Sequence, residues 1–180
     1  MKKFSVLVAV LLAALFVVGC ASKPPAGPTA AELMAEAKSG APMGALVGQA
    51  TAQGSKDNSA VNKAEQNAMG QIKKGLVSIV AEMLTAQVQE GRLQSATAEE
   101  FRTSVNGLLQ MASLTGIQRV DSGNDAAFKS WAIVALSKAE ALKEITSAVN
   151  AAKRDVSGSS NFSLDGFDAA FAKAADKEWK

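Results

Sequence analysis

The sequence predicts an α+β fold: a small antiparallel sheet of about three strands packs against one long helix, with additional helices including one at the C-terminus. Two observations predict the sheet. Residues 45–52 are rich in β-branched and small side chains, and two further apolar stretches at 116–121 and 128–136 flank a turn of Ser, Gly, Asn and Asp. The third observation predicts the helix, because apolar residues recur every three or four positions from Val61 to Met83.

The N-terminus has the pattern of a secretory signal. Two lysines follow Met1, a largely apolar run extends from Phe4 to Val18, and the small Gly19 precedes Cys20, the only cysteine of the chain. This run is shorter than the roughly 20 apolar residues that a membrane-spanning helix needs. We therefore predict a signal peptide over residues 1–19 that is cleaved between Gly19 and Cys20. The alternative, an ordinary signal or anchor with an incidental cysteine, leaves the Gly-Cys pair unexplained.

Residues 17–20, Val-Val-Gly-Cys, resemble the lipobox of bacterial lipoproteins. The resemblance implies that Cys20 becomes the mature N-terminus and carries palmitate-type acyl chains. Two or three such chains hold a protein stably at a bilayer, because each buried methylene contributes about 0.8 kcal/mol. Ala21 and Ser22 then follow, which resembles a signal for transport to the outer membrane in Gram-negative cells, because the inner-membrane retention residue Asp is absent. We expect a lipid-anchored protein of the cell envelope, at the outer membrane and on its periplasmic face rather than the cell surface.

The composition limits the chemistry that the chain can perform. It contains no histidine, which excludes histidine-based nucleophilic couples and imidazole metal sites. Its single thiol is expected to carry lipid, which excludes thiolate metal sites and disulfides. The lysines are scattered without a basic stripe, so nucleic acid is not an expected partner. Partial likenesses to a phosphate loop at 48–56 and to a calcium loop at 155–166 fail at required positions. We expect a protein without enzymatic activity, catalytic residues, cofactor or metal.

Residues 20–43 are predicted to form the lipidated N-terminus and a flexible tether, since they hold all four prolines and few large apolar side chains. Thr29 to Glu32 has the form of a capping box, so a short helix that includes Leu33 and Met34 and a mobile linker are both open here. The α+β domain is predicted over 44–155. A Ser/Gly-rich link and an amphipathic C-terminal helix follow over 156–180.

The long helix is predicted from Val61 to about Gln89, with capping residues at 57–59 and a stop at Gly91. Alanines at successive contact positions in its first half would allow a close approach, so this half should pack flat against a sheet. The residues predicted to face inward are Val61, Ala64, Ala68, Ile72, Leu76, Ile79 and Met83.

Capping boxes predict the starts of two further helices, at Thr97–Glu100 and at Ser137–Glu140. Glu99 and Glu100 are adjacent carboxylates, but their place at a helix start explains them without an acid–base role. The third helix should end near Asp155. The predicted inward residues are Phe101, Val105, Leu108, Leu109 and Ala112 in the second helix, Leu142, Ile145, Val149 and Ala152 in the third, and Leu164, Phe167, Phe171, Ala174 and Trp179 in the C-terminal segment.

The strands 116–121 and 128–136 are predicted to form a hairpin with its turn at 122–125. The stretch from Trp131 to Leu136 is apolar at consecutive positions, so both faces of this strand should be covered. We therefore expect it to be the central strand of the sheet.

These elements resemble a family of small lipoproteins named after a twenty-kilodalton membrane-associated lipoprotein of Helicobacter, which includes flagellar basal-disk lipoproteins. The matching residues are 47–52, Ala64 and Ala68 leading to Ile72, 115–117, and 128–136, within a region of about 46–152. The strand after Gly116 lacks the family's usual aromatic residue, and the tail after Asp155 lies outside the pattern. The resemblance implies a small α+β domain in membrane-bound proteins that assemble with themselves or with envelope machinery, and no catalytic residue.

We expect from this a structural or interaction lipoprotein that self-associates or binds an envelope partner, in flagellar or surface architecture. The alternative is an accessory binding lipoprotein that docks on a cell-wall synthase or holds a small apolar ligand between helix and sheet. A carboxylate-dependent hydrolase is the third hypothesis, and no motif in the sequence supports it.

Overall fold

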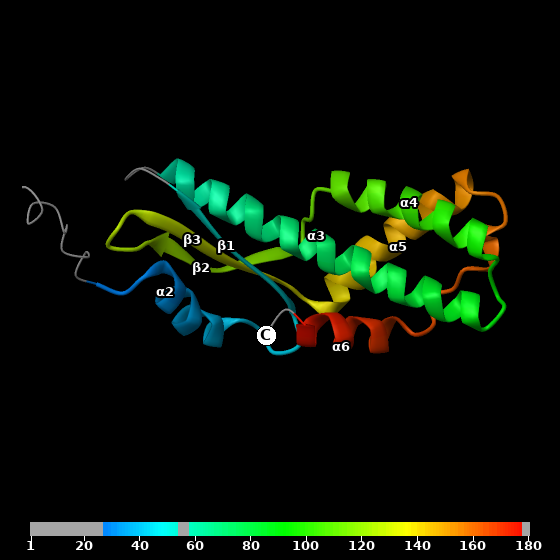
Figure 1. The fold of residues 1–180 in the computed structure, drawn as a ribbon, viewed down its shortest axis with the longest axis horizontal. Coiled ribbons are helices and arrows are strands. Elements are labelled where there is room, and N and C mark those ends of the chain that lie inside the picture. The colour runs from blue at the N-terminus through cyan, green and yellow to red at the C-terminus, as the bar shows by residue number, and fades with distance from the viewer. Residues whose placement is uncertain (1–26, 54–57, 178–180) are drawn as a thin grey trace, which may run out of the picture.

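The computed structural model describes residues 27–53 and 58–177. The predicted signal peptide, Gly19, Cys20 and Trp179 lie outside these residues. The described elements, in chain order, are α2 (Ala30–Ala37), η1 (Lys38–Gly40), β1 (Leu46–Gln53), α3 (Asn58–Gln89), α4 (Ser95–Met111), β2 (Ile117–Asn124), β3 (Lys129–Leu136), α5 (Lys138–Asp155), η2 (Ser159–Asn161) and α6 (Phe167–Lys177). The predicted α+β fold is confirmed, with a three-stranded antiparallel sheet, one long helix and a C-terminal helix (Figure 1).

Helix α3 runs through the whole length of the molecule and joins two regions of different composition (Figure 1). We call the first the sheet half: α2, the three strands, and residues 58–74 of α3. We call the second the helical half: residues 75–89 of α3 together with α4, α5, η2 and α6. Helix α3 contacts β1 and β3 of the sheet as well as α4 and α6.

The sheet has the strand order β1-β3-β2, so the predicted central position of β3 is confirmed. All pairs are antiparallel, and Leu136 of β3 lies opposite both Leu46 of β1 and Ile117 of β2. Strand β2 carries a β-bulge at Val120, where the register with β3 shifts by one residue. The bulge lets β2 continue to Asn124, which is three residues beyond the predicted end.

The turn of the β2–β3 hairpin is therefore displaced from the predicted 122–125. It is closed by Asp125, whose Oδ1 accepts the backbone N–H groups of Ala127 and Lys129 at 2.9 and 2.8 Å. The N–H of Phe128 donates to the carbonyl oxygen of Asp125 at 3.0 Å. An Asp side chain that bonds the backbone two residues ahead is a common way to fix a turn.

The two faces of the sheet are covered by different helices. Val134 and Leu136 of β3 belong to the main core with α3, whereas Trp131 and Ile133 face the opposite side and pack with Ala30 of α2. Helix α2 starts at a complete capping box. The backbone N–H of Thr29 donates to the carboxylate of Glu32, and the backbone N–H of Glu32 donates to the hydroxyl oxygen of Thr29. Of the two possibilities open for this segment, the helix forms. Residues 30–37 of the predicted tether 20–43 are thus helical, with Ala30 buried and Leu33, Met34 and Ala37 partly buried against the sheet.

Helix α3 approaches β1 as closely as two backbones can pack, as the alanine spacing predicts. Ala64 and Ala68 are fully buried, and Gly48 of β1 lies against Ala68. A Cβ at Gly48 would lie 2.0 Å from the carbonyl oxygen of Ala68. Gly48 is therefore required by the close contact with the helix backbone. The last part of the phosphate-loop likeness, residues 54–56, lies outside the described residues.

Both free edges of the sheet carry features that hinder further strand pairing. On β1, the backbone N–H of Gln49 donates to Oε1 of Gln71 on α3 at 3.0 Å. On β2, the bulge interrupts the ladder, and Arg119 forms an ion pair with Glu65 of α3. Bulges, charges and covered backbone groups are the means by which natural sheets protect their edges.

The core of the helical half contains large side chains from each of its helices. Phe101 of α4 is fully buried, and its ring centroid lies 5.1 Å from that of Phe162. Phe167 and Phe171 of α6 pair at 5.7 Å, so the predicted apolar face of the C-terminal helix is confirmed for these residues. Ile145 of α5 is also fully buried, as predicted.

Three predictions in this half are wrong in detail. Helix α4 begins at Ser95, and its N-cap Gln94 makes no side-chain bond, so Thr97 lies inside the helix and does not cap it. Leu142 is exposed, because the buried face of α5 uses Ala141 and Ala148 beside Ile145. Ala112, predicted as an inward residue of the second helix, is the extended C-cap of α4 and is only half-buried. In each case the tertiary contacts, rather than the local pattern, determine which residues are inside.

The end of α3 agrees with the prediction of a stop at Gly91. Gly91 has a left-handed φ of 71°, and the N–H groups of Gly91 and Arg92 donate to the carbonyl oxygens of Val88 and Gln87 at 3.1 and 2.9 Å. These two bonds form a Schellman motif, which satisfies the last carbonyls of a helix.

Candidate functional site

The predicted lipidation site, Cys20, and the cleavage position after Gly19 precede the first described residue, Gly27. The structure therefore describes the domain that such an anchor would carry. Among residues 27–53 and 58–177, no helix combines the length and the apolar composition that crossing a membrane requires.

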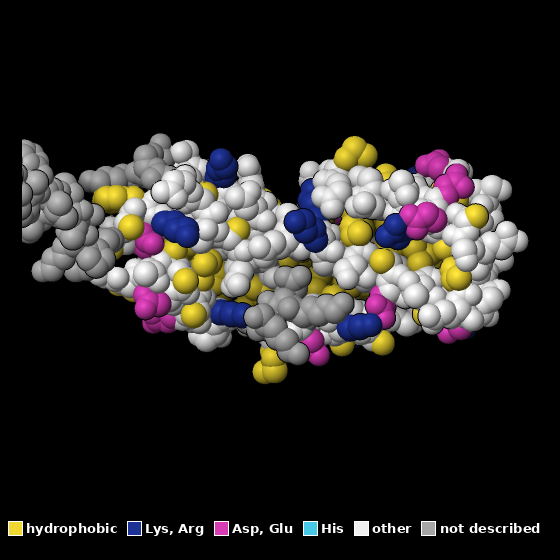
Figure 2. All heavy atoms as spheres, viewed as in Figure 1, with side chains coloured by type: hydrophobic (Ala, Val, Ile, Leu, Met, Phe, Trp, Pro, Cys, Tyr) yellow, Lys and Arg dark blue, Asp and Glu magenta, His cyan; other side chains and the backbone are white. Residues whose placement is uncertain are grey.

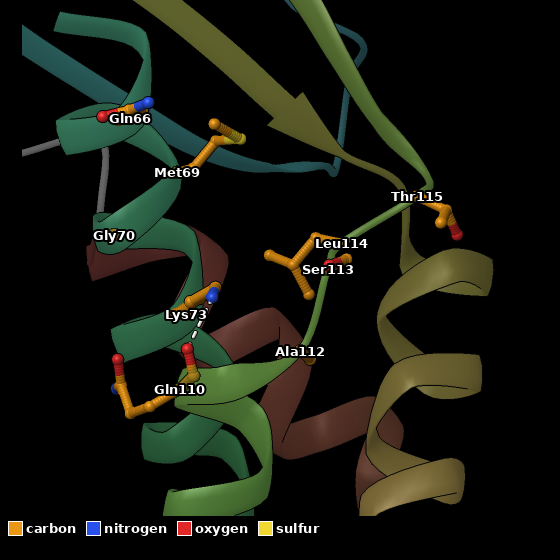
Figure 3. Close-up of a pocket in the computed structure, with 9 residues that line it drawn as sticks. All are labelled: Gln66, Met69, Gly70, Lys73, Gln110, Ala112, Ser113, Leu114 and Thr115. Carbon is orange, nitrogen blue, oxygen red and sulfur yellow. Dashed lines mark hydrogen bonds between the residues drawn. The ribbon is translucent and has the colours of Figure 1, made fainter. Parts of the chain in front are cut away.

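A groove lies where the sheet half meets the helical half, and Figure 2 shows the outline of the molecule notched between the two halves. Its volume is about 580 Å³. One wall comes from α3 and the other from the end of α4 and the segment that leads to β2 (Figure 3). The lining residues are Gln66, Met69, Gly70, Lys73, Gln110, Ala112, Ser113, Leu114 and Thr115.

The groove arises because α4 ends at Met111 and the chain leaves the helix in an extended conformation at Ala112. Residues 112–115 then run alongside α3 to reach β2 (Figure 3). Opposite them, Gly70 has no side chain, and a Cβ added there would meet nothing within 4 Å. The hollow is thus a consequence of two chain segments that diverge and of a glycine on the facing helix.

One charged side chain lines the groove, and it is already engaged. Nζ of Lys73 donates to the carbonyl oxygen of Gln110 at 2.6 Å, which satisfies a carbonyl at the C-terminus of α4 (Figure 3). A cation at this end of a helix is also favoured by the helix dipole. Lys73 therefore positions α4 against α3.

The remaining lining residues are apolar or neutral. Met69 and Leu114 both pack on the main core from positions that are only partly buried. Gln66 and Thr115 are exposed and can exchange hydrogen bonds with an occupant. The described lining residues include no carboxylate, imidazole or thiol, so this groove offers surfaces for contact and hydrogen bonding and supplies no pair of groups for proton transfer. The described ranges also hold no cluster of three or more potential metal-ligating side chains.

The adjacent carboxylates Glu99 and Glu100 lie on the exposed face of α4. Glu99 forms an ion pair with Arg102, and this hydrogen bond lowers the pKa of Glu99 below its usual value. A general acid needs a pKa raised toward neutrality. The structural interpretation of this pair is therefore favoured, although its role is an ion pair within the helix and not the predicted cap.

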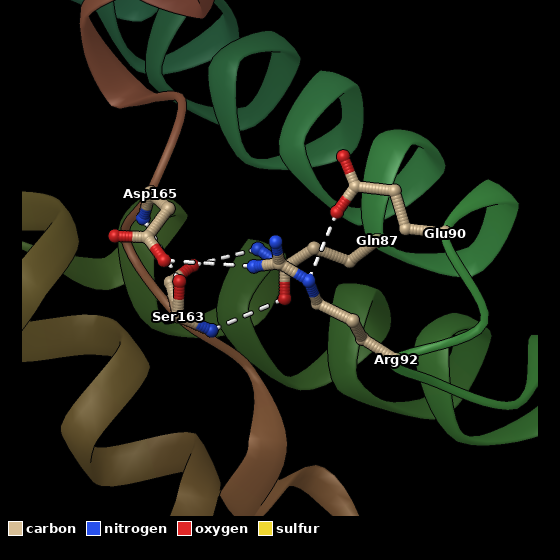
Figure 4. Close-up of polar contacts among 5 residues, drawn as sticks. All are labelled: Gln87, Glu90, Arg92, Ser163 and Asp165. Carbon is tan, nitrogen blue, oxygen red and sulfur yellow. Dashed lines mark hydrogen bonds and ion pairs between the residues drawn. The ribbon is translucent and has the colours of Figure 1, made fainter.

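A second polar cluster ties the end of α3 to the segment before α6 (Figure 4). Gln87 is buried, its Nε2 donates to the carbonyl oxygen of Ser163 at 2.7 Å, and its Oε1 accepts the N–H of Ser163 at 3.1 Å. At the surface, Arg92 pairs with Glu90 at 2.9 Å and with Asp165 at 3.5 Å. These contacts hold the segment before α6 against the end of α3.

Sequence reasoning did not find the groove. Its lining comes from two segments more than thirty residues apart, and each is unremarkable by itself. The one available signal is Gly70 in the middle of a long helix, because an isolated helical glycine costs stability unless it has a packing or functional reason.

No family model matches this chain, and no curated protein or solved structure shows significant similarity to it.

Proposed function

We propose that this chain is a lipid-anchored protein of the bacterial cell envelope that acts by protein contact, assembling with itself or with an envelope partner. The observation that carries the proposal is the Gly19-Cys20 pair directly after a short apolar run. The folded part begins close behind it, since the capping box of α2 starts at Thr29. A short link between an anchor and a domain keeps the domain at the membrane.

The chemistry of the described surface supports contact as the mode of action. The groove between the halves is open and neutral apart from Lys73, which is bonded to Gln110. Small molecules are usually buried to 70–90% in closed pockets. An open groove with apolar walls and a few hydrogen-bonding groups suits a segment of another protein chain better. Outer-membrane placement follows from Ala21 and Ser22, and a flagellar association from the family resemblance, so both belong to the proposal.

The anchor is tested by expressing the full chain and measuring the mass of the mature N-terminus. We expect a cysteine that carries acyl chains, and we expect Cys20→Ser to accumulate as an uncleaved precursor. Ser22→Ala is the matched control, because it lies two residues away and should be processed normally. An unmodified thiol in the mature protein would refute the anchor.

The contact function is tested on the mature lipoprotein in mild detergent. Light scattering and chemical cross-linking should show a defined assembly, either of copies or with a co-purifying envelope protein. Ser113→Arg places a long cation in the groove and should weaken that assembly. Ser78→Arg, on an exposed position of the same helix that forms the other wall, should not. A monomer at every concentration, with no partner, would count against the proposal.

The alternative is an accessory lipoprotein that holds a small apolar ligand. Met69 and Leu114 favour it, because they give the groove apolar walls. The space between α3 and the sheet cannot hold the ligand beside β1, because Gly48 and Ala68 are in contact there. Native mass spectrometry of the purified protein should then detect a bound apolar molecule, which Ser113→Arg displaces.

A further inference from the structure

The described chain starts at one end of the molecule, beside the tip of the β2–β3 hairpin (Figure 1). Gly27 is so close to this tip that a Cβ added to it would lie 2.9 Å from Cβ of Ala126. The backbone N–H of Ala30 donates to Oδ2 of Asp125 at 3.0 Å. The start of α2 and the hairpin tip are thus held together as one unit.

The length of chain before Gly27 limits how far this unit can lie from an anchored Cys20. Six residues, 21–26, separate the cysteine from Gly27, so that seven Cα–Cα steps join the two. Fully extended, they span at most about 25 Å. Helix α3 alone, with 32 residues, is about 48 Å long. The hairpin tip is therefore close to the bilayer, whereas the helical half at the opposite end can extend well away from it.

The surface of the tip suits a lipid interface. Pro28, Ala126, Ala127 and Phe128 are all exposed, and the side chain of Phe128 is 46% accessible. Phe128 is also the one residue other than glycine in the described ranges with a positive φ, at 59°. A bulky residue held in this conformation is unusual and suggests a functional reason.

The charged side chains at the tip also suit a lipid interface. The carboxylate oxygens of Asp125 accept hydrogen bonds from the backbone N–H groups of Ala30, Ala127 and Lys129. Lys129 is exposed beside the apolar residues. A lysine at the rim of an apolar surface can reach lipid phosphates while the apolar part enters the interface.

We propose that the hairpin tip at residues 126–128 rests on the bilayer that holds Cys20, with the ring of Phe128 inserted at the lipid interface. The inference rests on the proposed lipid anchor. It assigns an orientation to the domain: the sheet half faces the membrane, and the helical half projects from it.

The test uses the full mature lipoprotein in vesicles of phosphatidylethanolamine and phosphatidylglycerol. The native cysteine carries the lipid, so an introduced cysteine is the only free thiol. Ala127→Cys and Ala96→Cys are matched, because both replace an exposed alanine, at the hairpin tip and at the far end of the helical half. Each is labelled with an environment-sensitive fluorophore, and spin-labelled lipids are added as quenchers.

We expect strong quenching and a blue-shifted emission at residue 127, and neither at residue 96. Phe128→Asn should abolish the quenching at residue 127, because Asn tolerates a positive φ and removes the ring. The proposal is overturned if residue 127 is not quenched, or if Phe128→Asn leaves its quenching unchanged.

The result separates this inference from the proposed function. If the protein fails to float with the vesicles and Cys20 itself takes the label, the anchor is absent and both fail. If the protein floats, Cys20 is blocked, and residues 127 and 96 behave alike, the anchor stands and the orientation is wrong. Circular dichroism of each variant establishes that the fold is retained.

Discussion

The two halves of α3 pack in opposite ways although they belong to one helix. Residues 58–74 present alanines to the sheet, and at Ala68 the helix backbone lies directly over Gly48. Residues 75–89 present Ile79, Val80 and Met83 to the neighbouring helices. In the first half, the close contact with the sheet leaves no room for larger side chains. In the second half, large side chains fill the space between the helices. The sheet half should therefore be sensitive to added atoms, and the helical half to removed ones.

The largest effect is expected from Phe101→Ala in the helical half. Phe101 is fully buried against Phe162, and truncation of such a ring costs about 3–5 kcal/mol of unfolding free energy. Met111→Ala, on the same helix but at a side chain 78% exposed, should change stability by less than about 0.5 kcal/mol. Urea unfolding measures both. Hydrogen exchange should show α4–α6 losing protection before β3; equal losses would contradict the division into halves.

In the sheet half, we expect Gly48→Ala to cost about 3 kcal/mol, at the upper end of the range for overpacking. One added carbon would lie 2.0 Å from the backbone oxygen of Ala68, and a backbone cannot rotate away as a side chain can. Thermal unfolding measures the loss. A near-neutral result would mean that α3 lies farther from β1 than described, and that the contrast between the halves is wrong.

Gln87→Leu tests whether one polar contact secures the helical half. It retains the size of the side chain but leaves the N–H and C=O of Ser163 without their partner, which costs about 1–3 kcal/mol for buried groups. Gln89→Leu, at an exposed position two residues on, is the control. Limited proteolysis should cut near residue 163 more rapidly in the Gln87 variant alone.

Gly107→Ala should instead stabilise the protein, by about 0.8–1 kcal/mol, because alanine favours the helical state over glycine. Gly107 lies in α4, and a Cβ there meets nothing within 4 Å. Together with Gly48→Ala, this gives the same chemical change opposite signs in the two halves. A loss of stability measured in urea would contradict the open surface described for α4.

The smallest expected effect is the loss of the stabilising contribution of Asp125 at low pH. Hydrogen bonds from the backbone N–H of Lys129, and from those of Ala30 and Ala127, lower the pKa of Asp125. A lowered folded-state pKa means that the carboxylate stabilises the fold above its unfolded value of about 3.9 and loses this contribution as the pH falls through the folded pKa. Asp125→Asn should weaken the docking of α2 at neutral pH, and the difference from the native chain should disappear in strong acid. Hydrogen exchange in α2 measures it.

Much of the fold could be predicted because local signals and packing agree. The period of α3, its stop at Gly91 and the uninterrupted apolar run of β3 each specify one structure. Prediction failed where a distant contact overrides a local signal. Thr97 has the sequence of a cap, but α4 starts two residues earlier, with Ala98 and Phe101 both buried in the core. The bulge at Val120 shifts the hairpin turn, and no local pattern marks it.

The candidate site was beyond sequence reasoning for a different reason. A groove is a property of two surfaces and of the space between them, and its apolar walls at Met69 and Leu114 fit equally well into a core pattern. The sequence predicts an anchor at Cys20, and the structure describes residues 27–53 and 58–177 behind it. The proposed orientation needs both, because it combines the predicted anchor with the position of Gly27 beside the hairpin.

The protected edges of the sheet restrict the geometry of any assembly. With Gln71 bonded to the backbone of β1 and a bulge in β2, neighbouring copies at high concentration are hindered from extending one another's sheets into an open-ended fibre. Growth of that kind is the usual danger for β-rich proteins at high local concentration. We expect copies that do meet to do so through side-chain contacts on other surfaces, whose complementarity favours complexes of limited size.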